Sequence, residues 1–373
     1  MKIKIDKTKI KKILDKLQGL TNQKTSLNIT KNVLIKTVDD NFVSFSATDL
    51  TGEFYCIEEA EIESNGEIAI NSKKLFEIVK NYPDDYVSIE ETDPQWIKIG
   101  DNDLNYNLVG AVADDFPEIK ETFETDFFNT KSALFKKLLY TGFSINPETD
   151  ENRTFILGIN LNFINYDDKS CIKMFSTDTR RIVKYDIISD KPFSEDFNSK
   201  NFIVPKKILP DIIKFIDSED INISFTDDLF IINQNQEYFS VNLLEGTFPD
   251  CNQLVRGNEE DAIEIDKKIF SDMLTRTSIV CDEKNPILFF TFSENTLTLN
   301  ASNPELGEAK EKTEIEFNNE EFEIGFNPKF LLDFLKEIPD EKIKLYLKDS
   351  NSHCIIKGLE DNNFAAALMP IRI

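Results

Sequence analysis

Histidine is almost absent from this 373-residue chain, and the sequence lacks the signatures of most enzyme classes. The one histidine, His353, lies in the segment DSNSHC, which contains no nucleophile elbow. A Ser-His-Asp or Cys-His scheme would need this residue as its base, so neither kind of hydrolase is favoured. We interpret His353 first as a loop residue and second as the rim of a binding site. We predict that the chain is not an enzyme.

Nucleotide and metal motifs are also missing. The sequence has no G-x-x-x-x-G-K-[ST] and no G-x-G-x-x-G, which excludes a P-loop ATPase and a dinucleotide enzyme. Acidic runs such as NEEDAIEID lack the spacing of a calcium loop and indicate solvated surface. The cysteines are odd in number, widely separated and without a C-x-x-C pair: Cys56, Cys171, Cys251, Cys281 and Cys354. They are typical of reduced structural thiols, so we expect no metal and no cofactor.

Long apolar runs do not occur. The longest, such as ILFF at 287–290, fall far short of the roughly 20 residues that span a bilayer. The opening residues MKIKIDKTKIKKIL place Lys or Asp at nearly every second position and hold no apolar signal region. We expect a cytoplasmic protein with no membrane partner. The length and the 40% hydrophobic content predict a folded protein of two or three domains.

Positive charge is scarce: 43 Lys and Arg face 68 Asp and Glu, which gives a net charge of −25. Such a balance argues against a nucleic-acid partner if the charge is evenly spread, because cationic side chains drive phosphate binding. The charge is not evenly spread, and this becomes visible once the chain is divided into repeats.

Three copies of one module follow each other along the chain. A strand followed by a helix opening on lysine occurs as IAINSKKLFEIV, FIVPKKILPDII and EIGFNPKFLLDFL, from Ile68, Phe202 and Glu323. Ser72 is a suitable N-cap, and Pro205 and Pro328 suit a first helical turn. A second trio opens each module as IKIDKTKIKKIL, FFNTKSALFKKL and IEIDKKIFSDML. We therefore expect helices over 7–16, 73–80, 131–139, 206–216, 267–276 and 329–337.

An apolar residue before proline closes each module, in DDFPEI, GTFPDC and ALMPIR. The domain boundaries that follow are 1–124, 125–252 and 253–373. Segments between the helices alternate with period two, as in NFVSFSATDL and NTLTLNAS, which predicts half-buried strands. The expected fold class is α+β, with two helices per module on antiparallel sheet.

Five of the six expected helices carry a net positive charge, so the strands and loops hold all of the excess negative charge. A solvated helix face explains any one of them. Five in so acidic a chain favour a cationic surface that faces an anionic partner, with no interleaved aromatics to stack on single-stranded bases. Phosphate contact without base contact would hold DNA loosely and in any register.

Two carboxylates, Asp49 and Asp178, each follow a threonine near the end of an expected strand. They could be interpreted as a catalytic pair, but they belong to different modules. We predict that they cap turns instead.

The chain resembles the bacterial β sliding clamp family, the processivity subunit of the replicative DNA polymerase. The matching motifs are SATDL at 46–50, STDTRRI at 176–182 against the family's T-D-G-H-R-L, FIVPKK at 202–207, GTFPDC at 246–251, SNPE at 302–305 and MPIRI against M-P-M-R-L. They occur in the family's order over nearly the whole chain. The resemblance implies a homodimer closed head to tail around duplex DNA, without sequence specificity.

The resemblance also implies a hydrophobic pocket between the second and third modules for short linear motifs of polymerase, clamp loader and repair proteins. Its predicted walls are Ile156, Thr177, Thr179, Arg180, Arg181, Ile182, Pro249, Leu254, His353, Ala367, Met369, Pro370, Ile371, Arg372 and Ile373. Thr179 stands in place of the family's Gly, Arg180 in place of His and Ala367 in place of Val. We expect a pocket of altered shape with one more positive charge.

The remaining implied residues concern DNA and the ring seam. The DNA contacts are Lys24, Lys73, Lys206 and Lys207. The dimer interface joins Lys74, Tyr106 and Leu108 of module one to Ile279, Val280, Glu305 and Glu308 of module three. An interaction scaffold without a DNA function is the alternative. The terminal AAALM is expected to be a buried last strand whose end borders the pocket.

Overall fold

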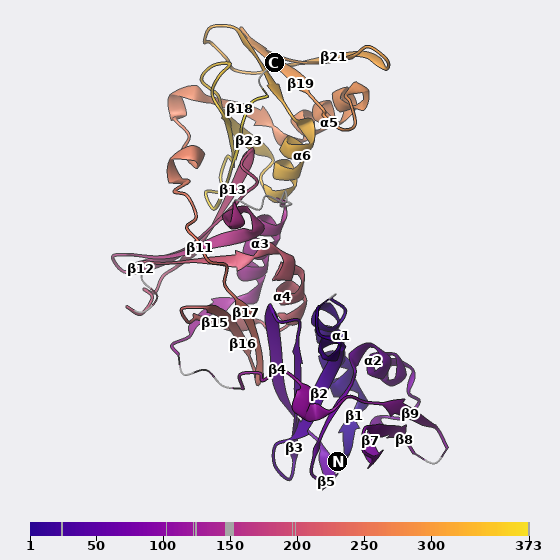
Figure 1. The fold of residues 1–373 in the computed structure, drawn as a ribbon. Helices are drawn as coiled ribbons and strands as arrows, with labels where there is room; N and C mark the ends of the chain where they lie inside the picture. Colours follow the sequence, from indigo (N-terminus) through magenta and orange to yellow (C-terminus); the bar gives the residue numbers. More distant parts are fainter. Residues whose placement is uncertain are drawn as a thin grey trace. The chain divides into compact units, whose positions relative to one another are not determined.

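The computed structural model describes residues 1–23, 25–101, 103–121, 123, 125–145, 153–195, 197 and 199–371 (Figure 1). The chain forms two compact units. Unit 1 contains Met1–Lys136 and Lys207–Leu243, and unit 2 contains Lys137–Lys206 and Leu244–Ile373. The division falls inside the helix α3, Ser132–Phe143.

Unit 1 is built on two antiparallel sheets. The five-stranded sheet has the order β5 (Glu61–Ser64), β1 (Lys2–Asp6), β7 (Tyr86–Asp93), β8 (Trp96–Gly100) and β9 (Asn105–Val109). The eight-stranded sheet has the order β10 (Phe128–Lys131), β15 (Asp220–Phe225), β16 (Leu229–Gln234), β17 (Glu237–Asn242), β4 (Gly52–Glu59), β3 (Phe42–Thr48), β2 (Asn32–Thr37) and β6 (Glu67–Asn71). Its helices are α1 (Lys7–Thr21), α2 (Ser72–Asn81) and α4 (Leu209–Phe215).

Unit 2 repeats this plan. Its eight-stranded sheet has the order β14 (Lys200–Pro205), β11 (Gly158–Tyr166), β12 (Lys169–Thr177), β13 (Arg181–Ser189), β25 (Phe364–Leu368), β24 (Cys354–Gly358), β23 (Lys342–Tyr346) and β18 (Ala262–Asp266). The four-stranded sheet has the order β21 (Gly307–Glu314), β20 (Thr296–Asn303), β19 (Leu288–Ser293) and β22 (Phe322–Phe326). Its helices are α5 (Lys267–Thr277) and α6 (Pro328–Glu337). The predicted α+β class with antiparallel sheets is confirmed.

The helices bury the apolar faces that their spacing predicts. In α1, Ile10, Ile13, Leu14 and Leu17 are each at most 3% exposed. Burying a side chain of this size contributes about 1.5–3 kcal/mol, so this face holds the helix on its sheet. Figure 1 shows α1 beside α2, and α5 beside α6.

Two expected helix starts are wrong. Asn71 is the N-cap of α2, because its side chain accepts from the Lys74 N–H, and Ser72 is already helical. Pro205 ends strand β14, and the short 3-10 helix Lys206–Ile208 separates it from α4. Pro328 does open α6, as its lack of a backbone N–H favours.

Helix α4 presses an acidic side chain against α1 within unit 1. Asp211 is 7% exposed, and a Cβ added at Gly19 would lie 1.5 Å from its Oδ1. Only a glycine leaves room for this carboxylate. Burial, together with the nearby Asp49 carboxylate, raises the pKa of Asp211 to about 6.

This raised pKa predicts a pH-dependent gain in stability for Asp211→Asn. A folded-state pKa above the unfolded value means that folding takes up a proton between about pH 4 and 6, so the ionised carboxylate destabilises the chain above that window. We expect Asp211→Asn to be more stable at pH 8 by about 1–3 kcal/mol and to lose this advantage near pH 4. Urea titrations of both proteins at the two pH values measure the difference, and an equal difference at both would contradict the assignment.

Among the described residues, no helix has the length and apolar character needed to cross a bilayer.

Candidate functional site

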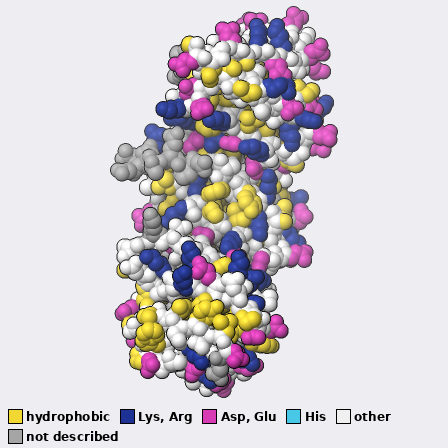
Figure 2. Space-filling model, turned by 90° about the vertical axis from the view of Figure 1, so that its right-hand side faces the viewer, with side chains coloured by type: hydrophobic (Ala, Val, Ile, Leu, Met, Phe, Trp, Pro, Cys, Tyr) yellow, Lys and Arg dark blue, Asp and Glu magenta, His cyan; other side chains and the backbone are white. Residues whose placement is uncertain are grey.

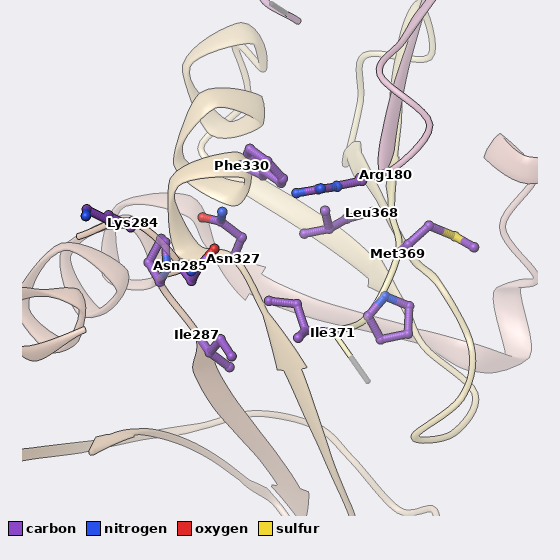
Figure 3. A pocket seen from close by; sticks show the side chains of 11 residues that line it. Arg180, Lys284, Asn285, Ile287, Asn327, Phe330, Leu368, Met369 and Ile371 are labelled. Atoms are coloured by element: carbon purple, nitrogen blue, oxygen red, sulfur yellow. The ribbon is translucent and has the colours of Figure 1, made fainter. Parts of the chain in front are cut away.

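A cavity of about 370 Å³ opens in unit 2 beside the junction of strands β13 and β25 (Figure 3). Four chain segments line it: Arg180 in the turn before β13, residues 284–287 before β19, Asn327 and Phe330 at the start of α6, and the tail 368–371. In the close view the Arg180 side chain extends toward the Phe330 ring. The lining combines apolar walls with two basic residues, Arg180 and Lys284, and contains no carboxylate.

The tail is fixed in place by its backbone. Strand β25 pairs with β13, with Ala367 opposite Ile182. Beyond the strand, the Met369 N–H donates to the Arg180 carbonyl at 2.9 Å and the Ile371 N–H donates to the Gly325 carbonyl at 2.8 Å. The Met369 side chain is 51% exposed. The expectation of a buried last strand is therefore confirmed, and the cavity lies beside the end of this strand.

The turn before β13 is organised by Asp178. Its Oδ1 accepts from the backbone N–H groups of Arg180 and Arg181, at 3.0 and 2.9 Å. In module one, Asp49 accepts from the N–H groups of Thr51 and Gly52 in the same way. Both carboxylates cap turns, as predicted, and each is engaged inside its own module.

Thr179 adopts a left-handed backbone conformation, with φ 74°. A β-branched residue is strained there, whereas glycine is not. We expect Thr179→Gly to raise the free energy of unfolding by about 1 kcal/mol, a gain reduced by the greater freedom of glycine in the unfolded chain. Leu50 has φ 70° in the matching turn of module one, so Leu50→Gly should behave alike. The thermal unfolding midpoints of the two variants measure the change in stability. A lower midpoint in both variants would show that neither backbone position is strained.

Arg181 lies behind the pocket and not in it. Its side chain is 6% exposed; Nε donates to Asp178 Oδ2 at 3.0 Å and a terminal nitrogen donates to Asp333 Oδ2 at 3.1 Å. The guanidinium carbon lies 4.0 Å from the centroid of the Phe330 ring. The predicted wall residue is thus a buried support that links the turn to α6 and orients Phe330.

Lys206 requires a correction. The side chain is 1% exposed, and its Nζ donates to the Thr177 carbonyl at 3.1 Å. Burial lowers the pKa of Lys206 to about 8. A buried ammonium presents no charge to a phosphate, so Lys206 supports the Thr177 turn and does not contact DNA.

Two of the other predicted pocket residues, Ile182 and Ala367, lie on the second face of the same sheet. Ile182 and Ala367 alternate in direction with Arg181 and Leu368, and they pack with Phe248, Cys251 and Val255 in one buried cluster. His353 Nε2 lies 3.0 Å from the Leu254 carbonyl oxygen, so the loop histidine contacts the connector between modules. Ile156 and Thr177 are buried, whereas Leu254 is 41% exposed. Pro249 belongs to the same connector, and Arg372 and Ile373 lie outside the described residues.

The cavity also contains residues that the sequence did not predict: residues 284–287, Asn327, Phe330 and Leu368. The motif FNPK does mark Asn327 as an N-cap, and its Oδ1 accepts from the Lys329 N–H at 3.0 Å. Phe330 follows in the first turn of the same helix. No sequence motif indicated that residues 284–287 lie beside the start of α6 and line the cavity.

The positive charge of helix α1 is partly neutralised by carboxylates that pack beside it. Lys9 pairs with Glu58, Lys12 pairs with Asp217, and the buried Lys16 pairs with both Asp217 and Glu237. Figure 2 accordingly shows Lys and Arg interspersed with Asp and Glu on the face in view. The cationic surface is weaker than the count of lysines suggests.

Two predicted DNA contacts remain accessible. Lys73 is exposed in the first turn of α2, and the exposed Lys207 donates from Nζ to Thr51 Oγ1 at 2.7 Å. Lys24 lies outside the described residues.

Three of the predicted seam residues lie on end strands of the two smaller sheets. In unit 1, Tyr106 and Leu108 are on β9, the last strand of its sheet, and Lys74 is exposed and paired with Glu77 at 2.9 Å. In unit 2, Glu308 is on the end strand β21 and Glu305 is in the turn before it. Ile279, in the 3-10 helix Ser278–Val280, is 74% exposed.

The chain has three modules, and neighbouring modules share a sheet. A groove lies beside one of these junctions. This is the architecture of a polymerase processivity clamp. Residues 1–120, 129–250 and 253–372 match the N-terminal, central and C-terminal domains of the DNA polymerase III beta subunit. The chain belongs to this family, the bacterial β sliding clamps, and it is a non-catalytic DNA sliding clamp.

Relatives of the chain agree over its whole length. The beta sliding clamp of Chlamydia pneumoniae is 27% identical over 377 residues, which cover 100% of this chain and 99% of that protein. The DNA polymerase III subunit beta of Pseudomonas aeruginosa has a TM-score of 0.91 at 24% identity, with 100% of both chains covered. A sliding clamp from the same organism, solved bound to griselimycin, has a TM-score of 0.89 at 25% identity.

Proposed function

We propose that two copies of this chain close head to tail into a ring around duplex DNA, with module boundaries near 124 and 252. The sheet topology is the observation that carries the proposal. Each eight-stranded sheet joins two modules through a last strand: β17 pairs with β4 in unit 1, and β25 pairs with β13 in unit 2. Both junctions are antiparallel.

The two smaller sheets are the halves of a third junction. The sheet β1-β7-β8-β9 corresponds to β10-β15-β16-β17, and the sheet β21-β20-β19-β22 corresponds to β4-β3-β2-β6. By this correspondence β9 of one copy pairs with β21 of the next. A head-to-tail contact of this kind generates a closed ring when the rotation that relates successive subunits brings the last one back to the first. Leu108 and Ile279 would supply the apolar contact, while Lys74, Tyr106, Val280, Glu305 and Glu308 surround it.

Ring closure explains the modest positive charge of the helices. A ring is retained by topology, so its lining needs no tight contact with phosphate. Strong contacts would hold it at one place, because each phosphate neutralised adds to the affinity. Ion pairs such as Lys9–Glu58 moderate the attraction, and Lys73 and Lys207, together with Lys24, are the proposed DNA contacts.

The groove beside β25 is the proposed docking place for polymerase, clamp loader and repair proteins. Met369, Pro370 and Ile371 form an apolar wall, and Arg180 provides a donor that sets the direction of an extended peptide. Thr177 and Thr179 belong to the turn that carries Arg180, whereas Ile182 and Ala367 pack on the opposite face of the sheet, in the buried cluster with Phe248. Such a clamp operates in the cytoplasm, where the replicating DNA lies.

Native mass tests the oligomeric part of the proposal. Two chains of 43.0 kDa give a particle of about 86 kDa. A chain that stays at 43.0 kDa at micromolar concentration would contradict a closed dimer.

A further inference from the structure

Strand β18 in unit 2 and strand β1 in unit 1 are the same element of the repeat. Both show the same burial pattern, and their last residues, Asp266 and Asp6, cap the helix that follows. The next lysine donates from its backbone N–H to an equivalent carbonyl in each case, Lys7 to Asp85 at 2.8 Å and Lys267 to Glu341 at 2.9 Å. The environment of β1 can therefore be used to interpret that of β18.

The outer edge of β1 is covered by another strand, and that of β18 is not. Strand β5 pairs antiparallel with β1, with Ile62 opposite Ile3 and Glu61 opposite Lys4. Charge pairs reinforce the ladder: Lys2 Nζ lies 2.7 Å from Glu63 and Lys4 Nζ lies 3.7 Å from Glu61. Among the described residues, β18 pairs only with β23 and is the end strand of its sheet.

The chain segment that corresponds to β5 takes another course in unit 2. After β21, the Ile315 N–H donates to the Asn295 carbonyl at 3.2 Å, and the Asn295 N–H donates to the Phe317 carbonyl at 3.1 Å. This segment is thus bound to the turn between β19 and β20. A cavity of about 640 Å³ separates it from β18. Ile269 of α5, 48% exposed, adds an apolar wall to this cavity.

The charge of this cavity is opposite to that of β1. Its lining includes Glu264, Asp266, Glu314 and Glu316 against one lysine, Lys342. None of the three glutamates forms an ion pair within the described part of the chain. Glu264 occupies the position that Lys4 holds in β1, so the strand that would complete this edge must be basic and not acidic.

We propose that the β18 edge is a second docking surface, which binds an extended segment of a partner protein in which Lys or Arg alternates with apolar residues. The segment adds to β18 as an antiparallel strand, in the manner of β5 on β1. Backbone hydrogen bonds supply the affinity and the glutamates select basic residues. The other open edge at an equivalent position, β10, is less suited, because its Lys131 is already paired with Glu219 and Asp220. This surface does not involve the pocket beside β25.

A peptide pair made from the chain's own sequence tests the proposal. The probe is a capped peptide of residues 60–66, AEIESNG, carrying Glu61→Lys and Glu63→Lys, and the control is the unchanged sequence. Both are titrated to millimolar concentration into the full-length protein labelled at isoleucine δ-methyl groups. We expect the methyl signals of Ile265, Ile269 and Ile315 to shift with the lysine peptide and to need about tenfold more of the control.

Substitution of the exposed Glu264 by lysine reverses the charge on the β18 edge and provides a second test. In Glu264→Lys the preference should invert, with the unchanged peptide now the better ligand. Equal shifts with both peptides, shifts confined to other isoleucines, or no shift would each overturn the proposal. The last result is the one expected if the glutamates only protect an open strand edge from aggregation. None of these outcomes bears on ring closure or on the pocket at Met369.

Discussion

A chain shortened to end at Leu368 is expected to bind a peptide from the C-terminus of its polymerase at least 100-fold more weakly. The deletion removes Met369, Pro370 and Ile371, which form one wall of the cavity, together with the two residues that follow. Burying one or two apolar anchors contributes about 1.5–3 kcal/mol each, and 100-fold in affinity corresponds to about 2.7 kcal/mol. Fluorescence anisotropy of the labelled peptide measures the loss.

Two controls separate this effect from general damage. Met369→Ala keeps the backbone hydrogen bond to Arg180 and removes only an exposed side chain, so about tenfold weaker binding is expected. Ile188→Ala, at an isoleucine that is 59% exposed outside the cavity, should bind as the parent does. The native mass of the shortened chain should be unchanged. Unaltered peptide affinity after the deletion would disprove the assignment of this cavity.

Ile279→Asp is expected to convert the particle of about 86 kDa into a single chain of 43.0 kDa at micromolar concentration. The side chain is 74% exposed in one copy, and the proposed seam would bury it against the region of Leu108. A carboxylate buried there without a partner destabilises the dimer by several kcal/mol. This is enough to dissociate the seam, because a clamp loader must be able to open the same contact. Sedimentation velocity at several concentrations reports the dimer fraction.

Ile188→Asp is the matched control for the seam. It also places a carboxylate at a well exposed isoleucine on unit 2, but at a position that the proposed junction does not use. This variant should remain a dimer. If both variants dissociate, or if neither does, Ile279 is not at the seam.

The repeats in the sequence predicted much of the fold. The spacing of Ile10, Ile13, Leu14 and Leu17 identified the buried face of α1, because helical periodicity depends on local sequence alone. Turn capping by Asp49 and Asp178 was predictable for the same reason, since a short acidic side chain bonds to backbone within three residues.

Burial of a charged residue was not predictable from local sequence. Lys206 lies between a strand and a helix, where an exposed lysine could equally stand. The Thr177 carbonyl that accepts its hydrogen bond lies 29 residues away in the sequence. Arg181 was expected in the pocket and is instead held by Asp333, 152 residues further on. Long-range ion pairs of this kind depend on packing, which a periodicity does not encode.

The residues of the cavity likewise divide into those that local motifs predicted and those that only the tertiary packing brings there. The tail at Met369 and the turn at Arg180 were identified by their motifs, whereas residues 284–287 enter only because the loop before β19 packs beside α6. The open edge of β18 was likewise invisible, because its sequence matches that of the covered strand β1 in pattern and differs only in charge.

Retention on DNA of different topology tests the ring directly. The protein is loaded by its clamp loader onto a nicked circular plasmid, isolated by gel filtration, and then treated with a restriction enzyme that cuts the circle once. We predict that the protein remains with the circle and leaves after the cut, because its hold is topological and its phosphate contacts are weak. Equal retention on the circular and the linear DNA would contradict the account.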